Sequence, residues 1–272
     1  MKNLYKLNME VYWLDYTVSS ILFCVSFYFT YTMSSVISGV IAAIFLYRMG
    51  AFTHEIAHQN NNPKLTRFKF VWNLTTGLLI LQPSLRFTKP HIKHHTTGIF
   101  ATKNDPQYPL IFKNTKLAAG IFIVLPWALP IYNFLVCLFY KNRIENILYK
   151  NIEFTFAERN NISWFELYYV VLYAIGFATL PVSLFITYYL VSVGAWYLSV
   201  LRIPLEHPLS QYKKTSTARD QEVLSMTHES PLYIPIQPLA LRYHTIHHMY
   251  PKIPYHNIQK EHYRLRDSIS IN

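Results

Sequence analysis

Charged residues are scarce in this sequence of 272 residues. Asp, Glu, Lys and Arg make up 14% of the chain, whereas soluble domains contain about 25%. Intrinsic disorder is excluded, because 51% of the residues are hydrophobic and give ample apolar surface to bury. The charge is also one-sided, with 25 Lys and Arg, 14 Asp and Glu and a net charge of +11. A nucleic-acid binder would carry such charge on a hydrophilic surface, so the composition indicates a membrane protein with its cations on one side.

Cysteine is nearly absent, since the chain has only Cys24 and Cys137, both in apolar stretches. A thiol in such surroundings behaves as a small hydrophobic side chain. Two residues of this kind form neither a disulfide framework nor a CxxC metal site, which argues against a secreted scaffold. Histidine is abundant by contrast, at 12 residues, and its spacing carries more information than its number.

Long apolar runs predict two transmembrane hairpins. Thr17 to Met33 contains no charge and spans about 26 Å as a helix, close to a hydrocarbon core of about 30 Å. Met33-Ser34-Ser35 permits a turn, and Val36 to Phe52 returns across the membrane. Trp164 to Val200 is long enough for two crossings, at about 55 Å. Thr179-Leu180-Pro181 offers the turn near its middle, because proline disfavours helix at the preceding residue.

Basic residues lie almost entirely outside the apolar runs, and the hairpin tips near Ser34 and Leu180 carry none. If only the hairpins cross, all basic segments lie on one face, as the positive-inside rule expects. Phe68 to Leu85 and Lys116 to Tyr140 contain Trp and Pro and would lie in the interface or enter without crossing. We therefore expect an all-α integral membrane protein, a single domain over residues 1–272, with about four transmembrane helices and additional interfacial helices.

Most histidines gather in four places on this proposed face. His54 and His58 lie one helical turn apart directly after a predicted crossing, so both can bind one metal. The segments 91–95 and 244–248 share the pattern H-x-x-H-H, in which one turn can serve two adjacent metals. So many imidazoles suit a two-metal site in a helical cap on the cytosolic face, and imidazole binds iron, zinc and copper alike. The candidate ligands are His54, His58, His91, His94, His95, His207, His244, His247 and His248.

Three other kinds of protein can contain metal-binding histidines like these. His54-Glu55-Ile56-Ala57-His58 matches the H-E-x-x-H of zinc metalloproteases, but a protease leaves the other clustered histidines without a purpose. Glu55-x-x-His58 resembles half of a soluble carboxylate-bridged di-iron site, which needs a second E-x-x-H that the chain lacks. A metal transporter would place ionisable groups inside the spans, and the predicted spans are nearly free of them.

The histidine segments and their flanks resemble the integral-membrane fatty acid desaturase and hydroxylase superfamily. Its signature is three histidine boxes, H-x3/4-H, H-x2/3-H-H and H-x2/3-H-H, and the match covers residues 36–260. His247 to Asn257 is similar to the family's H-H-L-x-P-x-I-P-x-x-x-L segment. Asn104-Asp105-Pro106 resembles the D-P turn after the second box, and Arg202 to His207 resembles the family's R-x-x-x-E-H stretch.

This resemblance implies a di-iron centre that activates O2 and abstracts hydrogen from an unactivated C–H bond, chemistry that side chains alone cannot supply. It makes the eight box histidines iron ligands and His207 a ninth. Metal-bound histidine normally donates its other N–H to an acceptor, and we expect Glu55, Asp105 and Glu206 beside the boxes in that role. The remaining histidines are expected around the centre or at the surface: His228, His256 and His262.

The predicted function is an O2-dependent desaturase that introduces a double bond into the fatty acyl chain of a lipid or an acyl thioester. A hydroxylase or ketolase of a carotenoid, sterol or other lipid is the alternative, because the same oxidant can insert oxygen. The chain contains no cytochrome b5 motif, flavin fingerprint or ferredoxin cysteine set, so a separate donor of the ferredoxin or cytochrome b5 type is expected. The basic face would attract acidic carriers and anionic headgroups. We expect a bacterial inner membrane, with the endoplasmic reticulum as the alternative.

Overall fold

Helices dominate the computed structural model, which describes residues 4–107, 115–139, 152–208 and 213–269. Within these ranges the only extended pairings are two isolated bridges, Thr102 with Lys213 and Thr227 with Tyr243. The all-α class predicted from the apolar runs is therefore confirmed.

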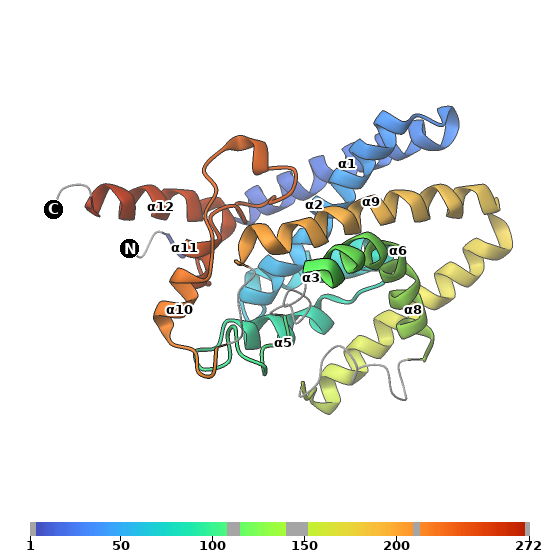
Figure 1. Ribbon diagram of the computed structural model, residues 1–272. Helices are drawn as coiled ribbons and strands as arrows, with labels where there is room; N and C mark the ends of the chain where they lie inside the picture. The colour runs from blue at the N-terminus through green and yellow to red at the C-terminus, as the bar shows by residue number, and fades with distance from the viewer. Residues whose placement is uncertain (1–3, 108–114, 140–151, 209–212, 270–272) are drawn as a thin grey trace.

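Both predicted hairpins are present. Helix α1 (Met9–Met33) turns at Ser34, which adopts a left-handed conformation with φ of 51°, into α2 (Val36–His58). The Ser35 hydroxyl accepts from the backbone N–H of Ser38 and caps the start of α2. Helix α8 (Phe156–Thr179) turns at Leu180 and Pro181 into α9 (Val182–Glu206). Both hairpin tips lie at the same end of the molecule, on the right of Figure 1.

The set of helices that are long and apolar enough to span a membrane differs from the predicted set in one member, because α6 takes the place of α1. Among the described residues, α2, α8, α9 and part of α6 (Thr115–Phe139) are long and apolar enough to cross, whereas α1 is not. Residues 16–33 of α1 carry no charge, but half of them are Ser, Thr or Tyr, which lower the hydropathy of this helix. By length and composition α6 is thus a candidate span, although it was expected in the interface.

Helix α5, which precedes α6 in the chain, contacts the start of α8, which follows it. Lys89, which precedes α6, forms an ion pair of 2.6 Å with Glu158 at the start of α8. Its ammonium also donates to the Glu153 carbonyl at 2.7 Å. Residues 89 and 153–158, which lie before and after α6 in the chain, are therefore close together in space.

The apolar stretch after α2 breaks into short elements, α3 (Thr66–Trp72), a π-helical turn (Asn73–Gly77) and α4 (Leu78–Ile80). Trp72 is fully buried and donates its indole N–H to the Met49 carbonyl of α2. Tyr12, Phe52 and Phe68 pack ring to ring at this junction of α1, α2 and α3. This part of the chain packs along the first hairpin and does not cross as one helix.

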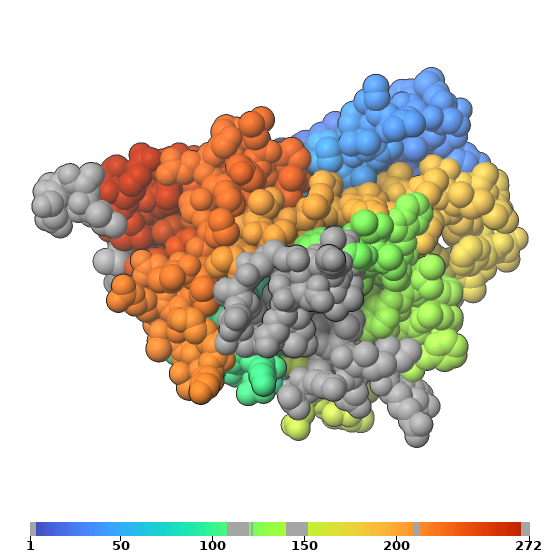
Figure 2. Space-filling view, viewed as in Figure 1, coloured from blue at the N-terminus to red at the C-terminus, as the bar shows by residue number. Residues whose placement is uncertain are grey.

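A cap of short helices closes the end of the bundle opposite the hairpin tips (Figures 1 and 2). In Figure 2 the orange and red cap segments lie on the left, and the blue and yellow hairpin ends lie on the right. The cap contains α5 (Ser84–His94), α10 (Ala218–Val223), α11 (His244–Met249) and α12 (Tyr255–Ile269). Both α2 and α9 end at this cap, which brings their last residues together.

Candidate metal centre

The cap brings all nine predicted ligand histidines into one region. The end of α2 carries His54 and His58 one turn apart, and His207 follows the last residue of α9. Helices α5 and α11 each place histidines three and four residues apart, the spacing that puts side chains on one helix face. These are His91, His94 and His95 from α5 and its C-cap, and His244, His247 and His248 from α11.

The ring nitrogens divide into two clusters. The first, called the His54 cluster, has ligand atoms that all lie within 4.8 Å of one another, on His54, His58, His91, His95 and His247. Two triplets that satisfy the same limit share His248: His94 with His95, and His207 with His244. We call His94, His207, His244 and His248 the His207 cluster. His95 borders both clusters, because its ring lies 4.2 Å from that of His248.

Distances within each cluster match those expected around an ion. The Nε2 atoms of His58 and His91 lie 2.7 Å apart, and those of His95 and His247 lie 3.2 Å apart. In the His207 cluster, His244 Nε2 lies 3.1 Å from His248 Nε2 and 3.2 Å from His207 Nε2. Ligand nitrogens held about 2.1 Å from a metal stand at similar separations, so each cluster fits one ion.

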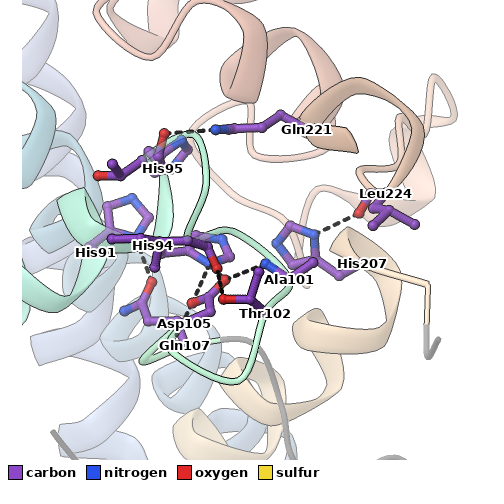
Figure 3. A network of polar contacts seen from close by, with 12 residues as sticks. His91, His94, His95, Ala101, Thr102, Asp105, Gln107, His207, Gln221 and Leu224 are labelled. Carbon is purple, nitrogen blue, oxygen red and sulfur yellow. Dashed lines mark hydrogen bonds and ion pairs between the residues drawn. The ribbon is translucent and has the colours of Figure 1, made fainter. Parts of the chain in front are cut away.

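Polar groups on the opposite ring edges orient several of these imidazoles (Figure 3). Asp105, which was expected beside the second box, accepts from His94 Nδ1 at 2.9 and 3.0 Å. His91 Nδ1 lies 2.7 Å from the Gln107 side-chain oxygen, and His207 Nδ1 donates to a backbone carbonyl at 2.9 Å. A bond at Nδ1 leaves the Nε2 lone pair of these rings for a metal.

Sequence reasoning missed the amides and the carbonyl in this set. Gln221 of α10 lies 3.0 Å from His248 Nδ1, and it donates to the His95 carbonyl at 2.7 Å. The carbonyl that accepts from His207 belongs to Leu224. Gln107 lies two residues after Asp105, so the D-P turn was a usable signal for it. No motif marks Gln221, because α10 meets the boxes only in the folded chain.

The other two predicted acids lie differently. Glu206 Oε1 is 3.6 Å from His244 Nδ1, close enough for an electrostatic contact with this cluster. Glu55 accepts from the Tyr12 hydroxyl at 2.6 Å and from the Tyr255 backbone N–H at 3.1 Å. A zinc protease needs this glutamate as general base beside the metal, whereas here its carboxylate joins α1, α2 and α12.

Burial lowers the pKa of most imidazoles in the cap. Loss of hydration, followed by repulsion from neighbouring histidines, lowers the pKa of the cap histidines well below the usual value, in His91, His95, His244, His247 and His248. The same causes lower the pKa of His207 to about 3. Burial opposes ionisation of Asp105, but the closeness of the His94 ring, the hydrogen bond from that ring and two backbone N–H bonds lower the pKa of the carboxyl. Neutral imidazole is the form that binds a metal.

His54 supports the metal interpretation independently. Its side chain is 2% exposed, and neither ring nitrogen has a hydrogen-bond partner within the described part of the chain. Buried polar atoms are nearly always paired, so both atoms call for an explanation. A metal bound by one of these nitrogens accounts for the missing hydrogen bond at that atom. The imidazoles of both clusters are donors that fit such an ion.

The three remaining histidines lie outside these clusters, as expected. His228 Nε2 lies 2.8 Å from the Leu205 carbonyl, and His256 accepts from the Asn8 backbone N–H. His262 Nε2 donates to the Glu229 carboxylate at 2.8 Å. Each of them therefore has a local partner that accounts for its position.

A cavity of about 340 Å³ leads from the clusters into the bundle. Residues of α2, α5, α6 and α9 line it, and His54, His91, His94, His207 and His244 form its inner end. A second cavity of about 190 Å³ continues between α6, α8 and α9 and is lined almost entirely by apolar side chains. The candidate centre therefore faces a space that is open to a molecule within the helix bundle.

Comparison with known proteins agrees with the geometry. The family model described as fatty acid desaturase matches residues 31–270, which include every histidine of both clusters. The chain is also 28% identical over 293 aligned positions to a ceramide hydroxylase of Caulobacter vibrioides (strain NA1000 / CB15N), covering 96% of this chain and 82% of that protein. The resemblance predicted from the boxes is thereby confirmed. This chain belongs to the fatty acid desaturase family and is an oxidoreductase that acts on lipids.

Proposed function

We propose that this chain uses two iron ions and O2 to hydroxylate a carbon atom of a membrane lipid. The observation that carries the proposal is the pair of histidine clusters at the inner end of a cavity between the bundle helices. When bound, a pair of iron ions supplies O2 activation and abstraction of hydrogen from an unactivated C–H bond. A ligand set made of imidazoles suits iron, whereas Mg²⁺ and Ca²⁺ require oxygen ligands.

The chain's own residues hold the ligands and the substrate. Asp105, Gln107 and Gln221 fix the orientation of His94, His91 and His248 through their Nδ1 atoms. Apolar walls of α6, α8 and α9 can receive a lipid tail directly from the bilayer and keep water from it. A site at the end of membrane-spanning helices thus meets its substrate without moving it through water.

Hydroxylation is the first choice because the ceramide hydroxylase matches nearly the whole chain. It replaces one C–H by C–OH, consuming O2, two electrons and two protons and releasing one water. Desaturation, the outcome predicted from the histidine boxes, uses the same reactants, removes hydrogen from two neighbouring carbons and releases two waters. It stays the second candidate because the family model is that of a fatty acid desaturase.

Electrons must come from a separate protein, and we propose a one-electron carrier of the ferredoxin or cytochrome b5 type. The net charge of +11 favours an acidic partner. We also propose that the cap faces the cytoplasm, because basic segments concentrate on cytoplasmic faces. A bacterial inner membrane fits the bacterial source of the relative.

Lipid analysis of cells under ¹⁸O2 tests the activity. Cells expressing the chain should accumulate a lipid that carries one ¹⁸O atom, whereas His247→Ala should abolish this product. His228→Ala is the matched control, because His228 lies outside both clusters. A lipid that has lost two hydrogens and gained no label would replace hydroxylation by desaturation. Purified protein containing one zinc and no iron would overturn both choices.

A further inference from the structure

An uncharged loop projects from the cap between α10 and α11. Residues 231–236, which we call the apolar loop, are Pro, Leu, Tyr, Ile, Pro and Ile. The Leu232 side chain is 85% exposed, and that of Ile234 is 43% exposed. Exposed apolar side chains that gather in one place mark contact with a membrane or with another molecule. The apolar loop therefore calls for an occupant.

The apolar loop lies against α2, which is long and apolar enough to cross a membrane (Figure 1). The Tyr47 hydroxyl of α2 donates to the Ile236 carbonyl at 2.6 Å. Leu239 and Leu241, which follow the loop, belong to the same buried core as Tyr47. Tyr47 lies 11 residues after Val36 at the hairpin tip, or about 16 Å along the helix. A hydrocarbon core of about 30 Å that begins at the tip extends past this level, so the cap reaches α2 at the depth of the bilayer.

The backbone N–H groups of the apolar loop are paired within the chain. Both prolines lack an N–H, and the Leu232 N–H donates to the Ser230 hydroxyl at 3.4 Å. The remaining N–H groups donate to carbonyls within residues 230–233 at distances from 3.0 to 3.3 Å, and they belong to Tyr233, Ile234 and Ile236. Hydrocarbon offers no partner to a backbone N–H, so a segment outside a long helix enters it only with these groups paired. The apolar loop meets this requirement, which water would not impose.

Lipid fits the apolar loop better than a protein partner does. The electron carrier proposed above is acidic and would be attracted to Lys and Arg, whereas the loop offers no charge. The neighbouring α1–α2 hairpin exposes apolar side chains along its length, among them Val18, Ile21 and Val40. Figure 2 shows orange segments of the cap directly beside the blue hairpin. The apolar loop therefore continues the surface that the first hairpin presents to lipid.

We propose that the apolar loop inserts into the bilayer beside α2, where Leu232 and Ile234 contact lipid acyl chains. The cap is then held on the membrane by its own loop as well as by the helices that enter it. Tyr47 also lines the large cavity, so the inserted loop contacts a residue of the cavity wall. This inference concerns how the cap is placed on the membrane, and it does not depend on the reaction that the histidine clusters support.

Spin labels on the apolar loop test its surroundings in the full-length protein, reconstituted in nanodiscs of phosphatidylethanolamine and phosphatidylglycerol. Leu232→Cys and Ile234→Cys each place a nitroxide in the loop. Cys24→Ala removes the exposed native thiol, and Cys137 stays buried. The lipid reference is Val40→Cys on the exposed face of α2, and the water reference is Gln259→Cys on the exposed face of α12. EPR power saturation measures collisions of each label with O2, which dissolves in lipid, and with a nickel chelate, which stays in water.

The ratio of O2 to nickel collisions for both loop labels should equal that of the α2 label and exceed that of the α12 label several-fold. A ratio like that of the α12 label would place the loop in water and overturn the proposal. Protection from both reagents would overturn it too, because a second copy of the chain or another protein would then cover the loop. Co²⁺ binding equal to that of the unlabelled protein shows that each variant is folded, as expected for substitutions at exposed positions.

Discussion

Asp105 offers the sharpest test of how the cap supports a metal. Its carboxylate accepts from His94 Nδ1 at 2.9 Å, and from the backbone N–H groups of Ala101 at 2.8 Å and Gln107 at 2.9 Å. The substitution Asp105→Asn removes the negative charge and leaves one accepting oxygen for these donors. Either His94 then loses the acceptor that fixes its ring, or the backbone N–H groups of the turn after α5 lose their acceptor.

Loss of such a partner typically weakens metal binding by about 10–100-fold, or about 1.4–2.7 kcal/mol. The full effect should fall on the His207 cluster, which contains His94. A smaller effect should reach the His54 cluster, because Asp105 holds the Gln107 backbone and the Gln107 side chain contacts His91. The substitution should thus weaken one metal-binding step more than the other.

Titration of the metal-free protein with Co²⁺ in competition with a chelator measures both steps. We expect one dissociation constant to rise by about 10–100-fold and the other to change far less. Asp267→Asn is the control, because its side chain is 69% exposed on α12. Equal weakening of both steps would refute the assignment of Asp105 to one cluster. Unchanged affinities would refute its role in holding His94.

Three further outcomes follow from the structure. Gln221→Leu should weaken Co²⁺ binding by about tenfold in the same titration, because Gln221 contacts His248 and the His95 carbonyl; an unchanged affinity would contradict this. Arg86→Met should destabilise the protein by about 3–5 kcal/mol in chemical unfolding, because it leaves the buried Glu166 unpaired, and a second substitution, Glu166→Leu, should restore most of the loss. The metal-free protein should melt at lower temperature at pH 5.5 than at pH 7.5, because below about 6.5 the unfolded chain binds protons that the folded His207, with its pKa of about 3, does not. A melting temperature that rises on acidification would show that these histidines are not held neutral.

The apolar runs predicted the hairpins but not their full length. Helix α1 begins at Met9, eight residues before the first uncharged run. Its start is stabilised by Asn8, the N-cap residue, and by Tyr12, which is fully buried in the first turn. Likewise α8 begins at Phe156, where Thr155 and Glu158 form a capping box. Hydropathy detects the part of a helix that faces lipid. It misses the turns that continue into the cap, where packing against the rest of the protein replaces contact with lipid.

Local spacing predicted the histidine clusters because each box places its rings on a single helix turn. The division into two clusters could not be read from the boxes, since each cluster takes rings from three separate segments. His95 and His248, for example, lie 4.2 Å apart across two elements that are far apart in the sequence. Their contact depends on how α5 and α11 pack, and pairwise packing of this kind is not encoded in any one segment.

Helix α6 shows how tertiary contacts can overturn a reading of proline. Pro126 and Pro130 favoured a stretch that lies in the interface or enters the membrane without crossing. Each proline removes one helical hydrogen bond, at the carbonyl four residues earlier. In the structure the Tyr197 hydroxyl donates to the Ile123 carbonyl at 2.7 Å, and the Tyr189 hydroxyl donates to the Trp127 carbonyl at 2.8 Å. Each accepting carbonyl lies three residues before a proline and next to the carbonyl that the proline leaves without its helical donor, so α9 contacts α6 at both of these turns. Neighbouring helices make proline tolerable in membranes in this way. The same bonds hold α6 against α9, where it forms one wall of the cavity beside the histidines.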